Sequence, residues 1–307
     1  MSLSAPLRRG IKNAPHPHLH GLVASNLQSA VISHRSMCLS IGHLPVNRPR
    51  ACQSATPADG PRLPSMLLMN DLEKYALEND RRLLFKWQHY FDIYDRHFSR
   101  FRGTDVHLLE FGVFQGGSLQ MWKDYFGPQS QLFGVDINPE CRRLEEDRVR
   151  IFTGNQEDRR FLKSLSTEIP RIDIVIDDGG HTMRQQIATF EELFPHISPH
   201  GIYLCEDLHT SYWRQWGGGF RRRGTFIEYS KQCIDWLNAW HSRHPARLPV
   251  TQFTRSVDSL HYYDSVLVIE KRPREKPFVV RSGIPSIPDY QGVGPGILDR
   301  LRFWFGR

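Results

Sequence analysis

Short apolar runs alternate with longer stretches in which apolar residues recur every three or four positions. The runs are typical of strands buried on both faces of a parallel sheet, and the stretches are typical of amphipathic helices. The expected strands are residues 106–111, 131–137, 149–152, 172–176 and 202–205. This repetition predicts an α/β fold with a doubly wound, mostly parallel, Rossmann-like sheet. Among the intervening helices we expect residues 138–146, 157–166 and 226–243.

Two further elements flank this repeat. Asn70 and Glu73 resemble a helix-capping pair, and large apolar residues follow at helical spacing, so we expect an added N-terminal helix over residues 70–102. The stripe consists of Leu84, Trp87, Phe91, Tyr94, Phe98 and Phe101. It would pack on the neighbouring domain or join two copies of the chain as a homo-oligomer. Residues 259–271 are rich in β-forming residues and predict a closing antiparallel hairpin.

The chain divides into three parts by composition. Residues 1–65 are rich in Ser, Pro, His and Arg and lack periodicity, so we expect a disordered extension, either a mis-called start or a transit-like segment. Residues 66–275 form the expected folded domain. Residues 276–307 are punctuated by Pro and Gly and form a C-terminal tail whose last part is amphipathic.

The net charge of +7 is concentrated at one end of the chain. Residues 1–65 hold seven Lys or Arg and one acidic residue, so the remainder is close to neutral and gives no reason to expect a nucleic-acid partner. No apolar run approaches the ~18 residues of a membrane span. The five cysteines are scattered without any C-x-x-C pair, which favours a reducing, cytoplasmic setting over a disulfide framework or a zinc site.

Polar residues follow the two central expected strands. Residues 177–181 read Asp-Asp-Gly-Gly-His, and Glu206 and Asp207 follow the next strand. Ligands of open α/β sheets lie outside the carboxyl ends of the strands, so these side chains are expected to meet at one edge. Each group alone has a simpler explanation: Asp177 and Asp178 could belong to a turn, and Glu206 and Asp207 could cap the next helix. These explanations account less well for both groups occurring together.

The turn after the first strand and the ends of the next two strands predict a nucleoside site. The glycines of the turn allow a ligand to approach the backbone closely. Glu110, the acid that precedes them, would repel a diphosphate but suits a cation. Asp136, at the end of the second strand, can accept hydrogen bonds from the hydroxyls of a ribose. The side-chain amides of Asn155 and Gln156, after the third strand, suit the polar edge of an adenine. The candidate cofactor residues are Glu110, Gly112, Gly116, Gly117, Asp136, Asn155, Gln156 and, more ambiguously, Asp177. A positively charged nucleoside, S-adenosylmethionine (SAM), fits this set better than NAD does.

These motifs resemble those of the class I SAM-dependent methyltransferases. The likeness covers roughly residues 70–270 and is specific to the metal-dependent sugar O-methyltransferase branch, typified by mycinamicin and rhamnosyl methyltransferases. It is carried by residues 108–117, 134–137, 174–181 and 206–212. Gly180 stands where the branch often has Ser before the His. The resemblance implies that Asp178, Glu206 and Asp207 bind Mg²⁺ and that His181 is the general base.

The implied chemistry agrees with these residue types. A sugar hydroxyl holds its proton at neutral pH, and a divalent ion with oxygen ligands can lower its pKa so that a histidine can remove the proton. All-oxygen ligands favour Mg²⁺ or Mn²⁺ over zinc. We therefore expect methyl transfer from SAM to a hydroxyl of a sugar or glycosylated small molecule. The glycine- and arginine-rich residues 213–225 could form a lid over the site.

Three alternatives keep the same fold. An NAD-dependent oxidoreductase would need a phosphate-binding turn that Glu110 disfavours. A non-haem iron hydroxylase-like enzyme would need two histidines and one carboxylate, which His181, His209 and Asp178 could supply. A non-catalytic nucleoside-binding scaffold would tolerate the loss of His181.

Overall fold

The computed structural model describes residues 69–287, so the expectations for residues 1–65 and for residues 288–307 lie outside the described part. The strands are β1 (His107–Phe111), β2 (Gln131–Asp136), β3 (Val149–Thr153), β4 (Ile172–Asp177), β5 (Ile197–Cys205), β6 (Val257–Tyr263) and β7 (Val266–Lys271). The helices are α1 (Asp71–Glu78), α2 (Tyr90–Phe98), α3 (Gly117–Phe126), α4 (Arg159–Glu168), α5 (Met183–Leu193), α6 (Phe226–Ser230), α7 (Gln232–Leu237) and α8 (Gln252–Ser256).

The seven strands form one sheet in the order β3-β2-β1-β4-β5-β7-β6. Strands β1 to β5 run parallel to their neighbours, and β7 pairs antiparallel with both β5 and β6. The order reverses between β1 and β4, so the carboxyl ends of these two strands lie at the point where an open α/β sheet binds its ligand. The Rossmann-like fold and its closing antiparallel hairpin are both confirmed.

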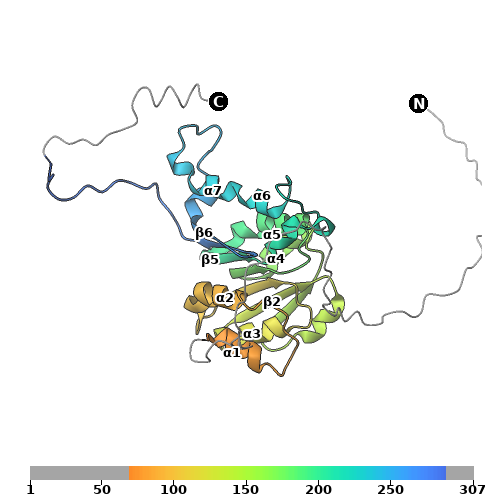
Figure 1. Cartoon of the computed structure of the whole chain (residues 1–307). Coiled ribbons are helices and arrows are strands. Elements are labelled where there is room, and N and C mark those ends of the chain that lie inside the picture. The colour runs from red at the N-terminus through yellow and green to blue at the C-terminus, as the bar shows by residue number, and fades with distance from the viewer. Residues whose placement is uncertain (1–68, 288–307) are drawn as a thin grey trace, which may run out of the picture. The chain divides into compact units, whose positions relative to one another are not determined.

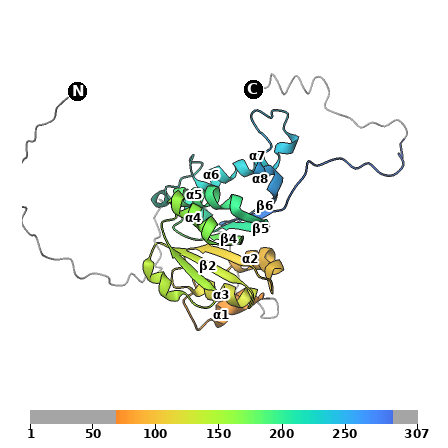
Figure 2. The ribbon, with the colours of Figure 1, turned by 180° about the vertical axis from the view of Figure 1, so that it is seen from behind.

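Helices cover both faces of the sheet (Figures 1 and 2). On one face α1, α2 and α3 enclose a core with alternate residues of the strands, including Leu108, Ile174 and Leu204. On the other face α4 to α8 pack on the intervening residues, among them Val175 and Tyr203. Residues of β4 and β5 alternate between these two cores, which explains why all of β4 and residues 201–205 of β5 are buried and mostly apolar.

The helix expected over residues 70–102 is interrupted, which corrects the prediction from the apolar stripe. The capping box of Asn70 and Glu73 is present, but α1 ends at Glu78 and α2 begins only at Tyr90. The Asn79 side chain accepts from the Arg81 N–H and donates to the Arg82 carbonyl, which gives the backbone a turn in place of helical hydrogen bonds. Residues 79–89, which we call the crossing segment, therefore run without regular structure toward the sheet edge.

Two other expected helices differ from the prediction. Residues 139–144 form a short 3₁₀-helix after the Asn138 cap and Pro139, in place of an α-helix over residues 138–146. The helix expected over residues 226–243 is divided into α6, α7 and a final 3₁₀ turn. The Asn238 side chain donates to the Ile234 carbonyl, so it competes with the backbone where α7 ends.

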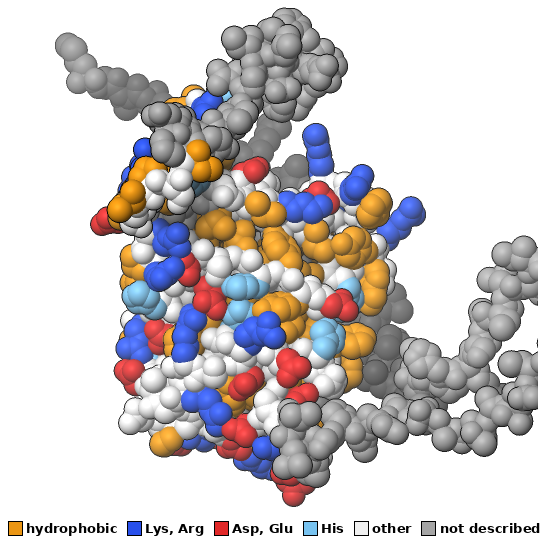
Figure 3. Space-filling model, turned by 60° about the vertical axis from the view of Figure 1, so that its left-hand side comes forward, with side chains coloured by type: hydrophobic (Ala, Val, Ile, Leu, Met, Phe, Trp, Pro, Cys, Tyr) orange, Lys and Arg blue, Asp and Glu red, His pale blue; other side chains and the backbone are white. Residues whose placement is uncertain are grey.

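The aromatic face of α2 is buried within its own domain. Tyr90, Phe91, Tyr94 and Phe98 are each at most 5% exposed, and Tyr94 and Phe98 pack against Trp122 of α3. These residues therefore pack on the neighbouring core, whereas Trp87 of the same stripe is 55% exposed. The face shown in Figure 3 mixes acidic, basic and hydrophobic side chains in its described part. Within residues 69–287, none of the helices combines the length and apolar character that a membrane span requires.

Candidate functional site

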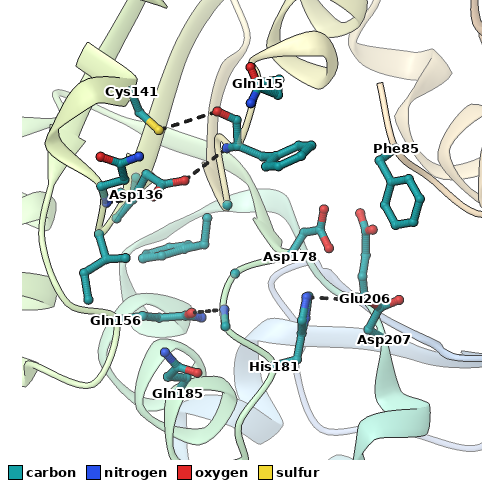
Figure 4. Close-up of a pocket in the computed structure, with 18 of the residues that line it drawn as sticks. Phe85, Gln115, Asp136, Cys141, Gln156, Asp178, His181, Gln185, Glu206 and Asp207 are labelled. Atoms are coloured by element: carbon teal, nitrogen blue, oxygen red, sulfur yellow. Dashed lines mark hydrogen bonds and ion pairs between the residues drawn. The ribbon is translucent and has the colours of Figure 1, made fainter. Parts of the chain in front are cut away.

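A cavity of about 890 Å³ lies at the carboxyl ends of strands β1 to β5. Its wall includes seven of the side chains or backbone positions that the sequence predicts for the site, and Figure 4 shows most of these together. They are Gly112, Asp136, Gln156, Asp178, His181, Glu206 and Asp207. The ends of five strands thus bring together residues up to 95 positions apart, as the parallel topology requires.

Three of these residues converge within the cavity. Asp178, His181 and Asp207 each offer one ligand atom, and these atoms all lie within 4.8 Å of one another. Nε2 of His181 lies 3.6 Å from Oδ2 of Asp207 (Figure 4), and Tyr90 donates to the other oxygen of Asp207 over 2.8 Å. The Nδ1 atom of His181 is buried without a hydrogen-bond partner in the described structure. This donor set suits a hard divalent cation.

The backbone around this group is held in uncommon conformations. His181 and Asp207 both have positive φ angles, of 55° and 54°, which non-glycine residues adopt rarely and mostly at sites where the surroundings fix them. Gly112 has φ of 91°, and a Cβ atom there would lie 2.0 Å from the carbonyl oxygen of Asp178. The turn after β1 can therefore lie directly against the turn after β4 only because residue 112 is glycine.

Glu206 faces a partner that the sequence did not suggest. Lys86, in the crossing segment, places Nζ 3.0 and 3.1 Å from the two carboxylate oxygens of Glu206 and 2.6 Å from Oδ2 of Asp178. The Tyr94 hydroxyl donates to Glu206 over 2.7 Å. Glu206 is consequently fixed from the α2 side and lies outside the convergent group of Asp178, His181 and Asp207.

Lys86 is buried, with its side chain only 3% exposed. Burial alone would lower its pKa, but attraction by Asp178 and Glu206, with a smaller contribution from Glu110, raises the pKa of Lys86 well above its ordinary value. The ammonium therefore stays charged and offsets part of the negative charge of the cluster. Glu110 accepts from the Ser118 hydroxyl over 2.8 Å and lies 3.4 Å from Lys86, so it faces the lysine and does not line the cavity.

The part of the cavity beside β2 has the donors and acceptors of a nucleoside site. The Asp136 carboxylate accepts from the backbone N–H groups of Phe114 and Asn138, over 3.0 and 2.8 Å. Phe114 and Ile137, both more than half exposed, flank it on the cavity wall. An acid fixed in this way at the end of the second strand, between apolar side chains, matches the expectation for a ribose beside a planar base.

Gln156, in the cavity wall, is hydrogen-bonded to Asp177, which lies buried behind it. Nε2 of Gln156 donates to Asp177 over 2.6 Å, and its Oε1 accepts from the Gly180 N–H over 3.0 Å. The Tyr203 hydroxyl donates to the other oxygen of Asp177. Burial raises the pKa of Asp177 to about 6, although the hydrogen bonds from Tyr203 and Gln156 oppose the rise. Asp177 therefore orders the turn of residues 178–181 from below, and the cavity wall does not include it.

Four other predicted cofactor residues also lie outside the wall. Gly116 has positive φ before α3, and Gly117 packs so tightly against the crossing segment that a Cβ atom would lie 2.3 Å from the Leu83 carbonyl oxygen. Asn155 accepts from the Glu157 N–H and shapes the turn before α4. With Glu110, these residues build the turns that carry the lining residues.

The crossing segment also brings two aromatic side chains to the cavity mouth. Phe85 and Trp87, on either side of Lys86, line the cavity but are 84% and 55% exposed. Trp87 meets His209 edge to face with ring centroids 6.1 Å apart. By contrast, the cavity wall includes no residue of 213–225, the segment expected to form a lid. Gly218 and Gly219 of that segment are hydrogen-bonded to Trp213 and Ser211.

Comparison with known proteins identifies the domain. A family model described as a methyltransferase domain matches residues 109–208, which contain β1 to β5 and the turns just described. The 8-demethyl-8-alpha-L-rhamnosyl tetracenomycin-C 2'-O-methyltransferase of Streptomyces olivaceus is 34% identical over 233 residues, which are 73% of this chain and 58% of that protein. The mycinamicin VI 2''-O-methyltransferase of Micromonospora griseorubida is 36% identical over 206 residues, covering 63% and 49%.

A solved structure agrees with these relatives. It is a methyltransferase of the mycinamycin biosynthetic pathway in complex with Mg, SAH and mycinamycin VI; it has a TM-score of 0.60 and 33% identity over 72% of this chain and 57% of that one. This chain thus spans between half and three fifths of the length of these relatives. Within that span, the chain carries a methyltransferase domain of the class I SAM-dependent fold and is similar to the metal-dependent sugar O-methyltransferases.

Proposed function

We propose that this protein transfers a methyl group from SAM to a hydroxyl group of a sugar or glycosylated small molecule, with the help of a divalent cation. One observation carries the proposal: Asp178, His181 and Asp207 converge in the cavity whose other end has the features of a nucleoside site. The relatives' names support the reaction class, because two of them are 2'- and 2''-O-methyltransferases of glycosylated metabolites.

The residues beside β2 would bind SAM. Asp136 would accept hydrogen bonds from the ribose hydroxyls, while Phe114 and Ile137 would flank the adenine ring. The methionine part would lie beside Gly112, which lines the cavity between β1 and β4. The acidic cluster lies beyond it, so a positively charged sulfonium is favoured at this end of the cavity. Gln156 would hold Gly180, and with it the turn that carries His181.

Asp178 and Asp207 would hold the cation, with Glu206 behind them. Carboxylate oxygens are the ligands that Mg²⁺ and Mn²⁺ prefer, and two carboxylates of the convergent group supply them. When bound, such an ion would orient the acceptor hydroxyls and lower the pKa of one of them. With the two carboxylates holding the ion, His181 would lie beside it.

His181 would remove the proton of the acceptor hydroxyl. Its Nδ1 is buried, so Nε2 is the nitrogen that a ligand in the cavity can reach. In the reaction the bond between the sulfur and the methyl carbon breaks as the bond to the hydroxyl oxygen forms, and the hydroxyl proton passes to Nε2. Asp207, 3.6 Å away, would stabilise the imidazolium that results. S-Adenosylhomocysteine leaves as a neutral thioether.

The residues that converge in the cavity favour this proposal over the iron-dependent alternative. A non-haem iron site needs two histidines and one carboxylate, but the convergent group contains one histidine and two carboxylates. Nδ1 of His209 contacts the Ser265 hydroxyl and lies 4.0 Å from Asp207. We also propose a reducing, cytoplasmic setting, because Cys141, Cys205 and Cys233 are all free and buried.

Calorimetry tests the proposal directly. The full chain is titrated with SAM in the presence and absence of Mg²⁺, beside Asp178→Asn and the control Asp147→Asn, whose side chain is solvent-exposed. We expect micromolar-range SAM binding in all three proteins, and an effect of Mg²⁺ that Asp178→Asn loses and Asp147→Asn retains. Tight binding of NADH, or no heat with SAM, would refute the proposed function.

A further inference from the structure

The buried contacts of Lys86 exceed what is needed to anchor a loop. Its Nζ lies within 3.4 Å of Glu110, within 2.6 Å of Asp178 and within 3.1 Å of both oxygens of Glu206. A lysine ammonium has three donors, and here all of them are directed at carboxylates. The lysine reaches this position from outside the strand repeat, because the crossing segment packs on Gly117 and Arg82 donates to the Leu144 carbonyl.

The carboxylates of this cluster need a compensating charge. Glu110, Asp178 and Glu206 face one another across the ends of adjacent strands, and Asp207 follows directly in the chain. Like charges gathered around one point repel where water is scarce, so these side chains would turn apart without a cation between them. Lys86 supplies that cation from the crossing segment, which also lines the cavity.

The lysine also determines which carboxylate atoms remain available to a ligand. Both oxygens of Glu206 are engaged by Lys86, and one of them also by Tyr94. Oδ2 of Asp178 is engaged by Lys86, which fixes the rotation of that carboxylate relative to His181 and Asp207. Groups that hold metal ligands in orientation affect metal affinity strongly even without touching the ion.

We propose that Lys86 is a positioning residue for the divalent cation, because its ammonium fixes the Asp178 and Glu206 carboxylates in the orientation in which the ion binds. This inference rests on the proposed function. Lys86 thereby couples the crossing segment, with Phe85 and Trp87 at the cavity mouth, to the ion at the ends of β4 and β5. A structural lysine without this role would affect folding stability but not ion affinity.

The test measures ion affinity without turnover. Mn²⁺ binding to the full chain is followed by the electron paramagnetic resonance signal of the free ion, for wild type, Lys86→Met and the control Lys163→Met, a surface lysine of α4. We expect about 10–100-fold weaker Mn²⁺ binding in Lys86→Met, the range found when groups that orient metal ligands are removed. Lys163→Met should match the wild type. Equal or tighter Mn²⁺ binding in Lys86→Met would overturn the inference, the latter by showing that Lys86 competes with the ion.

A second variant keeps the test valid if Lys86→Met does not fold. Glu206→Gln removes the carboxylate that Lys86 engages most fully, so the double variant Lys86→Met/Glu206→Gln carries no unpaired charge at that position. In the Glu206→Gln background, Lys86→Met should weaken Mn²⁺ binding much less than in the wild type, because the two residues act as a unit. Full additivity would overturn the inference. Wild-type protein that binds SAM but no Mn²⁺ would refute the ion site itself, whereas an unchanged Lys86→Met refutes only the role of Lys86.

Discussion

His181 is the residue on which the proposed chemistry depends most. Its replacement by glutamine keeps a polar side chain of similar length but removes a group that can accept the hydroxyl proton. We expect kcat to fall by about 10²–10⁴-fold, the usual contribution of a general base, with the dissociation constant for SAM unchanged. Initial rates with a glycosylated acceptor and SAM titrations measure the two quantities. His200→Gln, an exposed histidine of β5, is the control. An unchanged kcat would support a non-catalytic scaffold.

Gly112 shows how a backbone position limits the site. Gly112→Ala combines a positive φ with a Cβ atom 2.0 Å from the Asp178 carbonyl oxygen, whereas Gly127→Ala has a similar φ of 89° and no atom within 4 Å of the added carbon. We expect Gly127→Ala to lower the free energy of unfolding by about 1–3 kcal/mol, the cost of a sparsely populated, positive-φ conformation in a residue with a side chain. Gly112→Ala should cost about 3 kcal/mol or more.

Urea unfolding of the two glycine variants separates backbone conformation from contact. The difference between them reports the approach of the turn after β1 to the turn after β4, since the conformational cost is common to both. Gly112→Ala should also weaken SAM binding, because the displaced Asp178 belongs to the cavity wall. Equal losses of stability would show that the turn relaxes without cost and that the close approach is not required.

At the scale of elements, an ion-pair group links α2 to the closing hairpin. Nδ1 of His97 lies 2.5 Å from Oε1 of Glu270 in β7, and Arg100 donates to Oε2 over 3.0 Å. The hydrogen bond with His97, and then those with Arg100, lower the pKa of Glu270 to about 2 against the burial of the carboxyl group. The folded state thus favours the carboxylate, so its contribution to stability is present above the ordinary pKa of 4.5 and is lost as pH falls toward 2.

Glu270→Gln tests this link. We expect it to lower the free energy of unfolding by about 1 kcal/mol at pH 7, a value discounted for the partial exposure of the carboxylate. The difference from wild type should shrink between pH 4.5 and pH 2, which urea unfolding at several pH values can follow. Glu168→Gln, in an exposed pair with Arg150, should change stability little at any pH. A loss that persists unchanged at low pH would mean that packing, not charge, sets the effect.

The strand–helix repeat could be predicted from the sequence because each strand buries both faces and each helix one. The alternation of side chains between the two faces of a strand also indicates which acidic residues share a face. Glu110, Asp178 and Glu206 share the face of Leu108, Ile176 and Leu204, on the side of α2. Asp177 has the opposite parity, with Val175 and Cys205, and points to Gln156 and Tyr203. The period of two in a strand could therefore have separated Asp177 from the cavity residues.

The crossing segment was not predictable in the same way. Leu84 and Trp87 continue the three-and-four spacing of α2, so a helix was the simpler interpretation, and it gave no reason to place Lys86 at the acidic cluster. The turn at Asn79 depends on hydrogen bonds of one side chain, and the path that follows depends on packing against Gly117 and Gln120. Contacts between residues this far apart are absent from local periodicity.

For the whole molecule, the position of the cavity predicts how ligand binding affects unfolding. The cavity is built from β1, β2, β4, β5 and the crossing segment, and the sheet that carries them has one core on each face. Unfolding any of these elements destroys the binding site, so the described domain should unfold in a single transition that SAM shifts as a whole. At a free concentration of SAM about 100 times its dissociation constant, mass action adds about 2.7 kcal/mol to the free energy of unfolding.

This added free energy should raise the unfolding temperature by roughly 5–10 °C, since about 1 kcal/mol corresponds to roughly 2–4 °C in a domain of this size. Calorimetric scans at increasing SAM concentrations measure the shift, with NADH as a control that should leave the transition in place. Mg²⁺ should add a further shift that Asp178→Asn abolishes. If the scan separates into two transitions and SAM moves only one, the elements around the cavity unfold independently of the rest. That outcome would refute cooperative unfolding of the whole sheet, but it would not refute the proposed binding site.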